Sequence, residues 1–255
     1  MSTAVQQPPP DAPPTSPRTA RRPAGAAADA TFRAGATCAG VGILLLAVLG
    51  AFGVVFAVDG LVTPGDAART ARDVAGSELL FPLGIVSLLV TAAVDIVVAW
   101  ALHSVFRGTS SDLSMLAAWF RLAYAAVLLV AVGHLVGALR ILQTPAGAVG
   151  TAQDQARALA ELEAFHDVFS AGLVLFGVHL VLIGWLAHRS GLLPRLLAAL
   201  VCLAGLGYAF DSVASVLTNG SAPTVATVTF LGEFLLGVWL LVRGRRLAGE
   251  VRAGG

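Results

Sequence analysis

The sequence is poor in charged residues. Only 12% of its 255 residues are Asp, Glu, Lys or Arg, and all sixteen basic residues are arginine, so lysine is absent. An average soluble domain carries about a quarter charged residues, which keep its surface in water. The low charge and the mean hydropathy of +0.83 therefore argue against a soluble domain and predict a multi-pass membrane protein. The use of arginine alone, with many alanines and glycines, favours a bacterial source with a GC-rich genome.

Cysteine is scarce too, and the common catalytic motifs are absent. Cys38 and Cys202 lie in apolar runs without a C-x-x-C or metal-type spacing, so we interpret both as small packing residues. The sequence contains no G-x-S-x-G nucleophile motif, no H-E-x-x-H zinc motif, no phosphate loop and no dinucleotide-binding signature. We therefore predict no catalytic residue, no cofactor, no metal site and no nucleic-acid partner.

The N-terminal segment differs from the rest of the chain. Residues 1–31 hold seven of the twelve prolines, interleaved with Ala, Ser and Thr. Such a segment buries too little apolar surface to fold, and it is predicted to be a disordered tail. The membrane domain is then expected over residues 32–244, followed by a short basic tail at 245–255.

Long apolar runs fill the predicted membrane domain. Each is close to or longer than the roughly 20 residues that a helix needs to cross about 30 Å of hydrocarbon. Backbone polar groups in lipid must be satisfied within the segment, so the runs are predicted to be helices. The expected fold is an all-α integral membrane bundle of six transmembrane helices. The six spans are 34–58, 79–103, 116–142, 167–187, 196–217 and 223–242.

The distribution of arginine predicts the orientation of this bundle. Eleven arginines fall in or next to the two tails and in the loops after the second and fourth spans, four fall in or next to the loops on the other side, and Arg121 lies well within the third span. The positive-inside rule then places both termini in the cytoplasm. We expect a multi-pass protein of the bacterial plasma membrane, whose only predicted macromolecular environment is the lipid bilayer. The oligomeric state is left open by the sequence.

Two of the outer loops carry helix-forming signals. In residues 63–78, Thr63 can cap a helix that starts directly after it. Residues 151–166 have a good helix-forming composition, with Arg157 and Glu161 as an i,i+4 ion pair. We expect short surface helices in outer loops 1 and 3, which either stay separate or continue into the following spans.

Several stretches taken together resemble a known family. They are VTPGDAA (62–68), SELLFPLGIVSLL (77–89), LAAWFRLAYAAVL (116–128), FGVHLVLIGWLAHRSGLLPR (176–195), LAGLGYAFDS (203–212) and GEFLLGVWLLVRG (232–244), together with Asp95. Over residues 35–245 the chain is similar to the bacterial multi-pass membrane family catalogued as domain of unknown function 4386. That family has no established activity, so the resemblance implies the topology and assigns no chemistry.

Ionisable residues inside the predicted spans are the candidate functional residues. They are Asp95, Arg121, His134, His179, Asp211 and Glu233. A charge at the bilayer centre costs about 3 kcal/mol on insertion scales, and such residues face the bundle interior and often mark binding sites or proton paths. Depths calculated from the rise per residue predict that Arg121 pairs with Asp95, and His134 with Asp211. Glu233 and His179 are placed near the centre, within reach of either pair.

Three interpretations of this polar cluster remain open. It can form a binding pocket or a proton-titrating site, which makes the protein a non-enzymatic binder or carrier of a small solute or proton. It can be an internal network that only fixes helix packing and register. As a third interpretation, Asp211, His179 and Glu233 would serve a membrane-embedded lipid-modifying enzyme.

Overall fold

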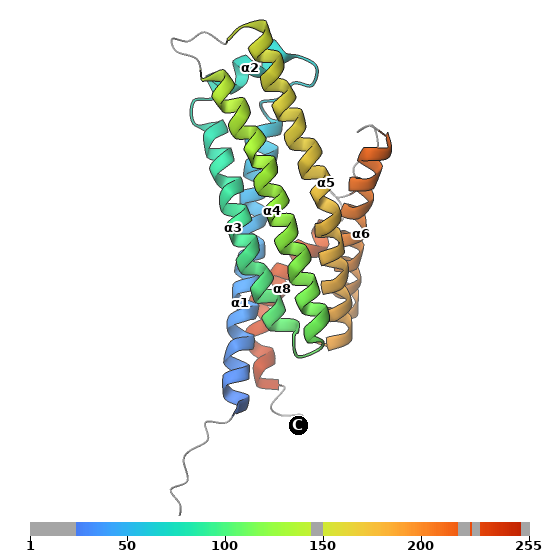
Figure 1. Ribbon diagram of the computed structural model, residues 1–255. Coiled ribbons are helices and arrows are strands. Elements are labelled where there is room, and N and C mark those ends of the chain that lie inside the picture. Colours follow the sequence, from blue (N-terminus) through green and yellow to red (C-terminus); the bar gives the residue numbers. More distant parts are fainter. Residues whose placement is uncertain (1–23, 144–149, 219–224, 226–229, 251–255) are drawn as a thin grey trace, which may run out of the picture.

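The computed structural model describes residues 24–143, 150–218, 225 and 230–250, with side chains described from residue 30 to residue 243 outside the gaps. Residues 1–23 of the predicted tail and 251–255 of the predicted C-terminal tail lie outside the described residues, and the first helix begins at Ala24. All regular secondary structure in the described part of the chain is helical, which agrees with the predicted all-α class (Figure 1).

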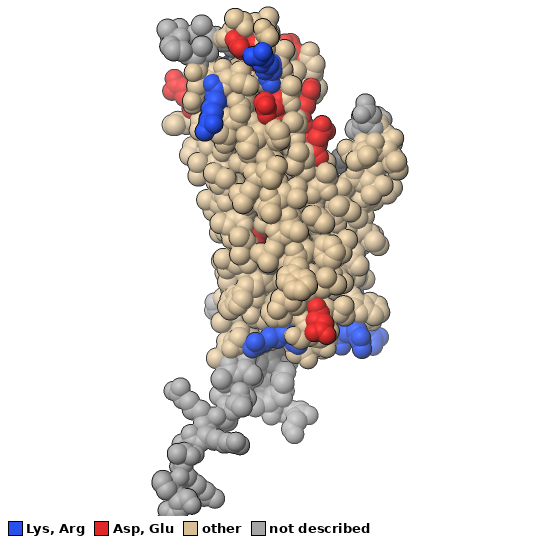
Figure 2. Space-filling view, viewed as in Figure 1, with Lys and Arg blue, Asp and Glu red and all other residues tan. Residues whose placement is uncertain are grey.

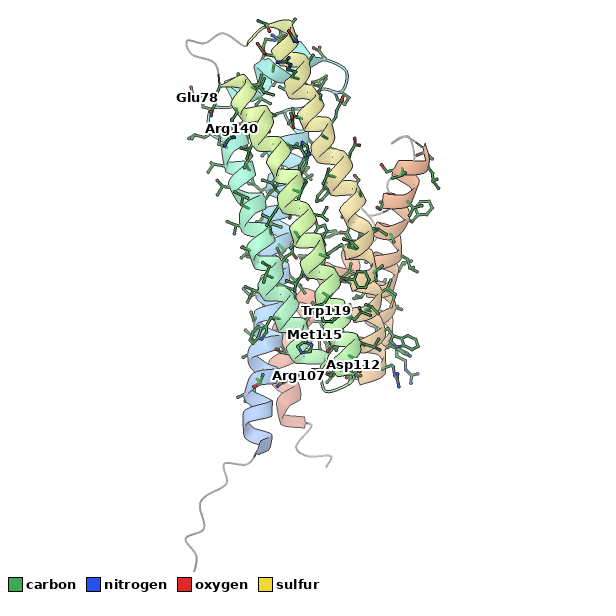
Figure 3. The ribbon with its side chains drawn as sticks, viewed as in Figure 1. Glu78, Arg107, Asp112, Met115, Trp119 and Arg140 are labelled. Atoms are coloured by element: carbon green, nitrogen blue, oxygen red, sulfur yellow. The ribbon has the colours of Figure 1, made fainter. Side chains whose placement is uncertain are left out.

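Five long helical segments match the first five predicted spans. They are α1 (Ala24–Gly50) with its π-helical continuation η1 (Ala51–Asp59), α3 (Leu80–Phe106), α4 (Ser111–Leu142), α5 (Ala152–Ser190) and α6 (Arg195–Thr218). All five are long and apolar enough to cross a membrane. Charged side chains gather at the two ends of the molecule and leave a largely uncharged belt between them on the face seen in Figure 2. Glu78 and Arg140 lie at one end of this belt, and Arg107 and Asp112 at the other (Figure 3).

The sixth predicted span is described only in its second half. Helix α8 runs from Leu231 to Glu250 and contains residues 231–242 of the predicted run. Of the first half, residues 223, 224 and 226–229 lie outside the described residues. The described segment contains Glu233 in its first turn, so the position of this carboxylate in the bundle is defined.

The long helices close into a ring in chain order. Helix α1 contacts α3, α3 contacts α4, α4 contacts α5, α5 contacts α6, α6 contacts α8, and α8 returns to α1. The start of α1 and the end of α8 lie at the same end of the bundle (Figure 1). A ring of this kind directs one side of every helix toward a common centre, where polar residues from different spans can meet.

Glycines set the closest contacts in this ring. A Cβ atom added to Gly177 of α5 would lie 2.5 Å from the carbonyl oxygen of Gly205 of α6, and one added to Gly40 of α1 would lie 2.9 Å from the carbonyl oxygen of Gly237 of α8. Neither position has room for a side chain, so the backbones approach directly. Small residues at helix contacts are typical of membrane bundles, where close packing replaces the hydrophobic driving force.

The outer loops correct one detail of the prediction and decide between two predicted alternatives in another. The surface helix of loop 1 is present as α2 (Ala67–Gly76), but its cap is Asp66, whose side chain accepts from the Arg69 N–H at 2.9 Å, and not Thr63. Gly65 has a φ of +75°, which breaks any helix that starts at Thr63 and delays the helix start. The predicted helix of loop 3 is not separate, because residues 152–166 continue directly into the fourth span as part of α5. This is the second of the two predicted alternatives.

The sequence explains why α5 is continuous from loop 3 into the fourth span. No proline interrupts Ala152–Ser190, and the helix is started by a capping box in which the Thr151 and Asp154 side chains each bond to the other's backbone N–H. Its 39 residues span about 58 Å, nearly twice the hydrocarbon thickness. The N-terminal part of α5 therefore projects beyond the membrane-spanning part of the bundle.

Candidate functional site

Arg121 of α4 lies at the centre of the ring and is the largest fully buried side chain in the described residues. Its Nε and Nη2 atoms lie 2.8 and 2.7 Å from Oδ1 of Asp95 on α3. Its Nη1 atom lies 3.1 Å from Nε2 of His179 on α5, and both Nη atoms lie 3.4 Å from Oε1 of Glu233 on α8. One guanidinium therefore joins four helices of the bundle.

His179 is held as a neutral imidazole in this network. Its Nδ1 lies 2.8 Å from the backbone oxygen of Ala117, which can only accept, so Nδ1 carries the proton. Nε2 then accepts from Arg121, which has only donors. Both ring nitrogens are engaged, and the side chain is fully buried. This arrangement fixes the ring and leaves it no free nitrogen.

The hydrogen-bonding capacity of Arg121 is fully used. A guanidinium has five N–H groups. The contacts with Asp95 use Nε–H and one Nη2–H, those with Glu233 use the other Nη2–H and one Nη1–H, and His179 accepts the last. Arg121 consequently offers no further donor to a molecule bound beside it.

The two carboxylates of the network differ in how firmly they are held. Asp95 is 3% exposed and contacts Arg121 at hydrogen-bonding distance, whereas Glu233 is 12% exposed and its contact is a long 3.4 Å. In each case only one oxygen is engaged, and no hydrogen bond from another described residue reaches Oδ2 of Asp95 or Oε2 of Glu233. Each carboxylate therefore keeps an acceptor that faces away from the guanidinium.

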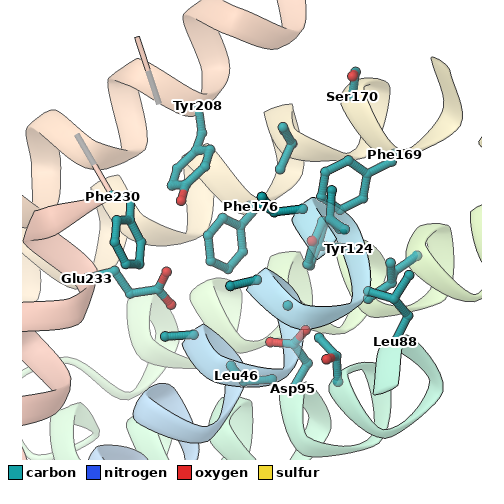
Figure 4. A pocket seen from close by; sticks show the side chains of 18 of the residues that line it. Leu46, Leu88, Asp95, Tyr124, Phe169, Ser170, Phe176, Tyr208, Phe230 and Glu233 are labelled. Atoms are coloured by element: carbon teal, nitrogen blue, oxygen red, sulfur yellow. The ribbon is translucent and has the colours of Figure 1, made fainter. Parts of the chain in front are cut away.

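A cavity of about 660 Å³ lies directly against this network. Asp95, Arg121 and Glu233 form its floor, and its walls are mostly apolar, with contributions from every long helix of the ring. Figure 4 shows the aromatic side chains around the space beside Glu233. The aromatic lining residues are Tyr124, Phe169, Phe176, Tyr208, Phe230 and Phe234.

The π-helix η1 supplies part of the wall opposite α5 and α6. Its residues Ala51, Val54 and Val55 line the cavity. A π-helix is wider than an α-helix and leaves the normal i→i−4 bonding pattern, and such segments are frequent at functional sites. At the junction, the Leu49 carbonyl oxygen accepts a hydrogen bond of 2.8 Å from the Ser87 hydroxyl of α3, which compensates for the changed pattern.

Two tyrosines present their hydroxyls to the cavity. Tyr124 is 7% exposed and packs against Phe176, with ring centroids 4.9 Å apart, and Tyr208 meets Phe176 edge-on at 5.3 Å. Neither hydroxyl has a hydrogen-bond partner within the part of the chain that the structure describes. No fully enclosed polar side-chain atom among those residues lacks a partner, so the accessible surface of these hydroxyls is provided by the cavity that both residues line.

The outer part of the cavity carries a second ion pair. Nε2 of His166 on α5 lies 2.7 Å from Oδ1 of Asp59 at the end of η1, while its Nδ1 lies 2.9 Å from the backbone oxygen of Leu162. A ring that donates to both acceptors is an imidazolium. The helices η1 and α5 are not neighbours in the ring, so this pair connects two opposite walls of the cavity. It lies far from Arg121.

The structure brings together four of the six predicted site residues. The predicted pairing of Arg121 with Asp95 is confirmed, and His179 and Glu233 join it. The predicted pairing of His134 with Asp211 is wrong. Helix α5 lies between α4 and α6 in the ring, so His134 instead meets Glu161 of α5 at 2.7 Å.

Asp211 belongs to the cavity and not to the Arg121 network. Its two carboxylate oxygens accept from the Val225 N–H at 2.9 and 3.0 Å, and the residue lines the cavity. Sequence reasoning did not select Tyr124, Tyr208, Asp59 or His166. Tyr124 could have been found, because it lies three residues after Arg121 and therefore on the same face of the helix. Among the described residues, no group of three or more His, Cys, Asp or Glu side chains could hold a metal ion.

Comparisons with known proteins agree with the resemblance seen in the sequence. A protein of Archaeoglobus fulgidus named only as an uncharacterized protein is 31% identical over 164 residues, which cover 64% of this chain and 85% of that protein. No solved structure matches the chain. The family described as domain of unknown function DUF4386 matches residues 38–244. Because this match covers most of the chain and includes all or part of every long helix described above, the chain belongs to the DUF4386 family.

Proposed function

We propose that this protein is a six-span membrane protein, with both termini in the cytoplasm, that binds or moves a small solute or proton through the cavity above Arg121. Helix α8 supports the sixth span, since it closes the ring between α6 and α1. The arginine-rich loop and tail segments support the orientation. A bacterial plasma membrane remains the predicted location, although the relative named above is archaeal.

One observation carries the functional part of the proposal, namely the cavity with its polar floor. Small-molecule sites are typically pockets of about 300–1,000 Å³ with mostly apolar walls and a few convergent polar groups. The cavity of about 660 Å³ has that size, and Asp95, Glu233 and the two tyrosine hydroxyls are its convergent polar groups. Ionisable residues inside a membrane bundle commonly mark the path of a solute or proton.

A structural role is the second candidate, and the geometry assigns it to one part of the cluster. Arg121, Asp95 and His179 satisfy one another and join three neighbouring helices. Such a network fixes helix register. This role coexists with binding, because the same network forms the floor of the cavity. Catalysis has less support, since His179 has no free nitrogen to act as a base.

Occupation of the cavity by a neutral probe tests the proposal. The full chain in lipid nanodiscs is titrated with N-phenyl-1-naphthylamine, an uncharged aromatic molecule, and compared with Ala47→Phe, which places a ring in the cavity from α1. The proposal expects the probe to raise the melting temperature of the wild type and not that of Ala47→Phe, because only binding to the folded state stabilises it. A proton flux in liposomes that Glu233→Gln removes would serve as the positive result for a proton path. If the wild type shows neither effect, the proposal is contradicted.

A further inference from the structure

We propose that the cavity selects an organic cation, an ammonium-type group attached to an apolar or aromatic body. This inference rests on the proposed function, since it names the class of molecule that the same cavity would take. It follows from the charge of the floor, from the hydrogen-bonding groups that remain available there, and from the aromatic walls.

The floor carries a net negative charge when both of its carboxylates are ionised. Arg121 contributes one positive charge, Asp95 and Glu233 contribute two negative charges, and His179 is neutral by its hydrogen-bonding pattern. The cation of the floor, Arg121, has no N–H left for an anion, because its five N–H groups are already used. The floor therefore repels anions and lacks one positive charge for neutrality.

The groups still available on the cavity side can all accept hydrogen bonds. Oε2 of Glu233 and Oδ2 of Asp95 accept only, and the hydroxyls of Tyr124 and Tyr208 both accept and donate. Tyr124 is more than nine-tenths buried, and its hydroxyl has no partner among the described residues. An ammonium N–H is a donor that matches this set of acceptors, and it also supplies the missing charge.

The aromatic walls favour a cation with an apolar body. The face of an aromatic ring attracts positive charge, and rings arranged around a site are used to recognise quaternary ammonium groups. The Phe176 ring already has the Arg121 guanidinium 5.1 Å from its centroid. The remaining surface around it comes from Tyr208, Phe230 and Phe234, which line the same space (Figure 4).

A bare metal ion does not fit this cavity. Calcium needs six to eight oxygen ligands at roughly 2.3–2.6 Å, and no metal-type group occurs in the described residues. The volume of about 660 Å³ is that of an organic molecule. Asp211 and Asp59 also line the cavity, so its ionisable lining consists of four carboxylates against the two cations Arg121 and His166. An excess of one sign in a lining raises the local concentration of the opposite ion.

A pair of ions with matched shape and opposite charge tests this inference. Tetraphenylphosphonium and tetraphenylborate are measured by equilibrium binding to the full chain in nanodiscs, with binding to protein-free nanodiscs subtracted and Ala47→Phe as the blocked control. We expect the cation to bind about tenfold more tightly or better, since a charge of the wrong sign is strongly disfavoured in a buried site. A smaller pair, benzylammonium and benzenesulfonate, repeats the comparison with a cation whose N–H groups can donate to the floor.

Three variants test whether the floor of the cavity causes the preference for cations. Glu233→Gln is expected to lower the affinity for the cation about tenfold and to raise that for the borate. Glu161→Gln makes the same chemical change in the pair with His134, outside the cavity lining, and should alter neither affinity. Tyr208→Phe removes only a hydroxyl that can accept an ammonium N–H, and it should weaken benzylammonium binding about threefold even if Glu233→Gln does not fold.

The outcomes separate this inference from the proposed function. If borate binds as tightly as the phosphonium and Ala47→Phe blocks both, the cation preference is wrong and the binding cavity stands. If neither ion pair nor the neutral probe binds to the wild type, both proposals are contradicted. If the cation is preferred but Glu233→Gln and Tyr208→Phe leave its affinity unchanged, the floor is not the source of the preference and the inference is overturned.

Discussion

Asp95 and Glu233 contact the same guanidinium, yet their surroundings differ. Asp95 lies within 2.8 Å of Arg121 and is almost completely enclosed, and it connects two helices that are neighbours in the ring. Glu233 lies 3.4 Å away, is four times as exposed, and faces the cavity from α8. A buried ion pair holds helices together only when its geometry is close. We therefore assign Asp95 a structural role and Glu233 a ligand-binding role.

Removal of the shared partner should have the largest effect on stability. Arg121→Met leaves two carboxylates in the bundle without their cation, and an uncompensated buried charge costs about 3–5 kcal/mol. We expect a loss of the folded monodisperse protein, measured by thermal unfolding and size-exclusion chromatography in detergent. The control Arg69→Met breaks an exposed pair with Asp73 and should leave both measurements unchanged. An Arg121→Met protein that melts with the wild type would contradict the central place of this residue.

A change in helix spacing should damage the cavity more than the Arg121–Asp95 pair. In Gly177→Val the added side chain meets the backbone of α6, where even a Cβ would lie 2.5 Å from the Gly205 oxygen. Overpacking of this kind costs about 1–3 kcal/mol. It also moves Tyr208 of α6 away from α5, so phosphonium binding should weaken. Gly133→Ala is the control, because nothing lies within 4 Å of an added Cβ there, and it should not lower the melting temperature.

Loss of a cavity hydroxyl should leave stability unchanged or raise it slightly. Tyr124→Phe removes a buried hydroxyl that has no partner among the described residues, and a polar group buried without a hydrogen bond disfavours folding by about 1–3 kcal/mol in protein mutants. The cavity reduces that cost, so an increase of up to about 1 kcal/mol in unfolding free energy is expected. Thermal unfolding measures it. A clear decrease in the unfolding free energy would mean that the hydroxyl stabilises the fold. Tyr124 would then have the structural role that is assigned to Asp95.

The smallest effect is expected at the ion pair of His134, the predicted site residue that lies outside both the Arg121 network and the cavity lining. His134 and Glu161 are each about one third exposed, and pairs of that kind contribute about 0–1 kcal/mol. Glu161→Gln should therefore shift the unfolding free energy by less than about 0.5 kcal/mol. A loss comparable to that of Arg121→Met would place this pair among the interactions that hold the bundle together.

The sequence predicts the first five spans because hydrophobic length and backbone satisfaction leave a membrane helix little choice. It also predicts the Arg121–Asp95 pair, since a short connection makes their helices neighbours and both residues lie on the same side of the membrane midplane. The pairing predicted for His134 is wrong because the prediction places residues 151–166 outside the fourth span. Because these residues extend α5 outward, Glu161 lies at the level of His134 and takes the place predicted for Asp211.

The cavity could not be predicted from the sequence. Its floor depends on which oxygen of each carboxylate Arg121 engages, and its walls depend on ring order and on side-chain packing between helices that are distant in the chain. Tyr208 lies three residues before Asp211 in the same span, but its hydroxyl gains significance only because α6 faces α8 and α5 across that space. Hydropathy and helical periodicity contain no information of this kind.

The most direct test is a comparison of Asp95→Asn with Glu233→Gln by thermal unfolding in one detergent, followed by phosphonium binding. The account predicts that Asp95→Asn melts several degrees lower, because about 1 kcal/mol corresponds to roughly 2–4 °C in a chain of this size. Glu233→Gln should melt within about 2 °C of the wild type and lose the cation affinity. Equal losses of stability for the two variants, or a larger loss for Glu233→Gln, would contradict the division of roles between the two carboxylates.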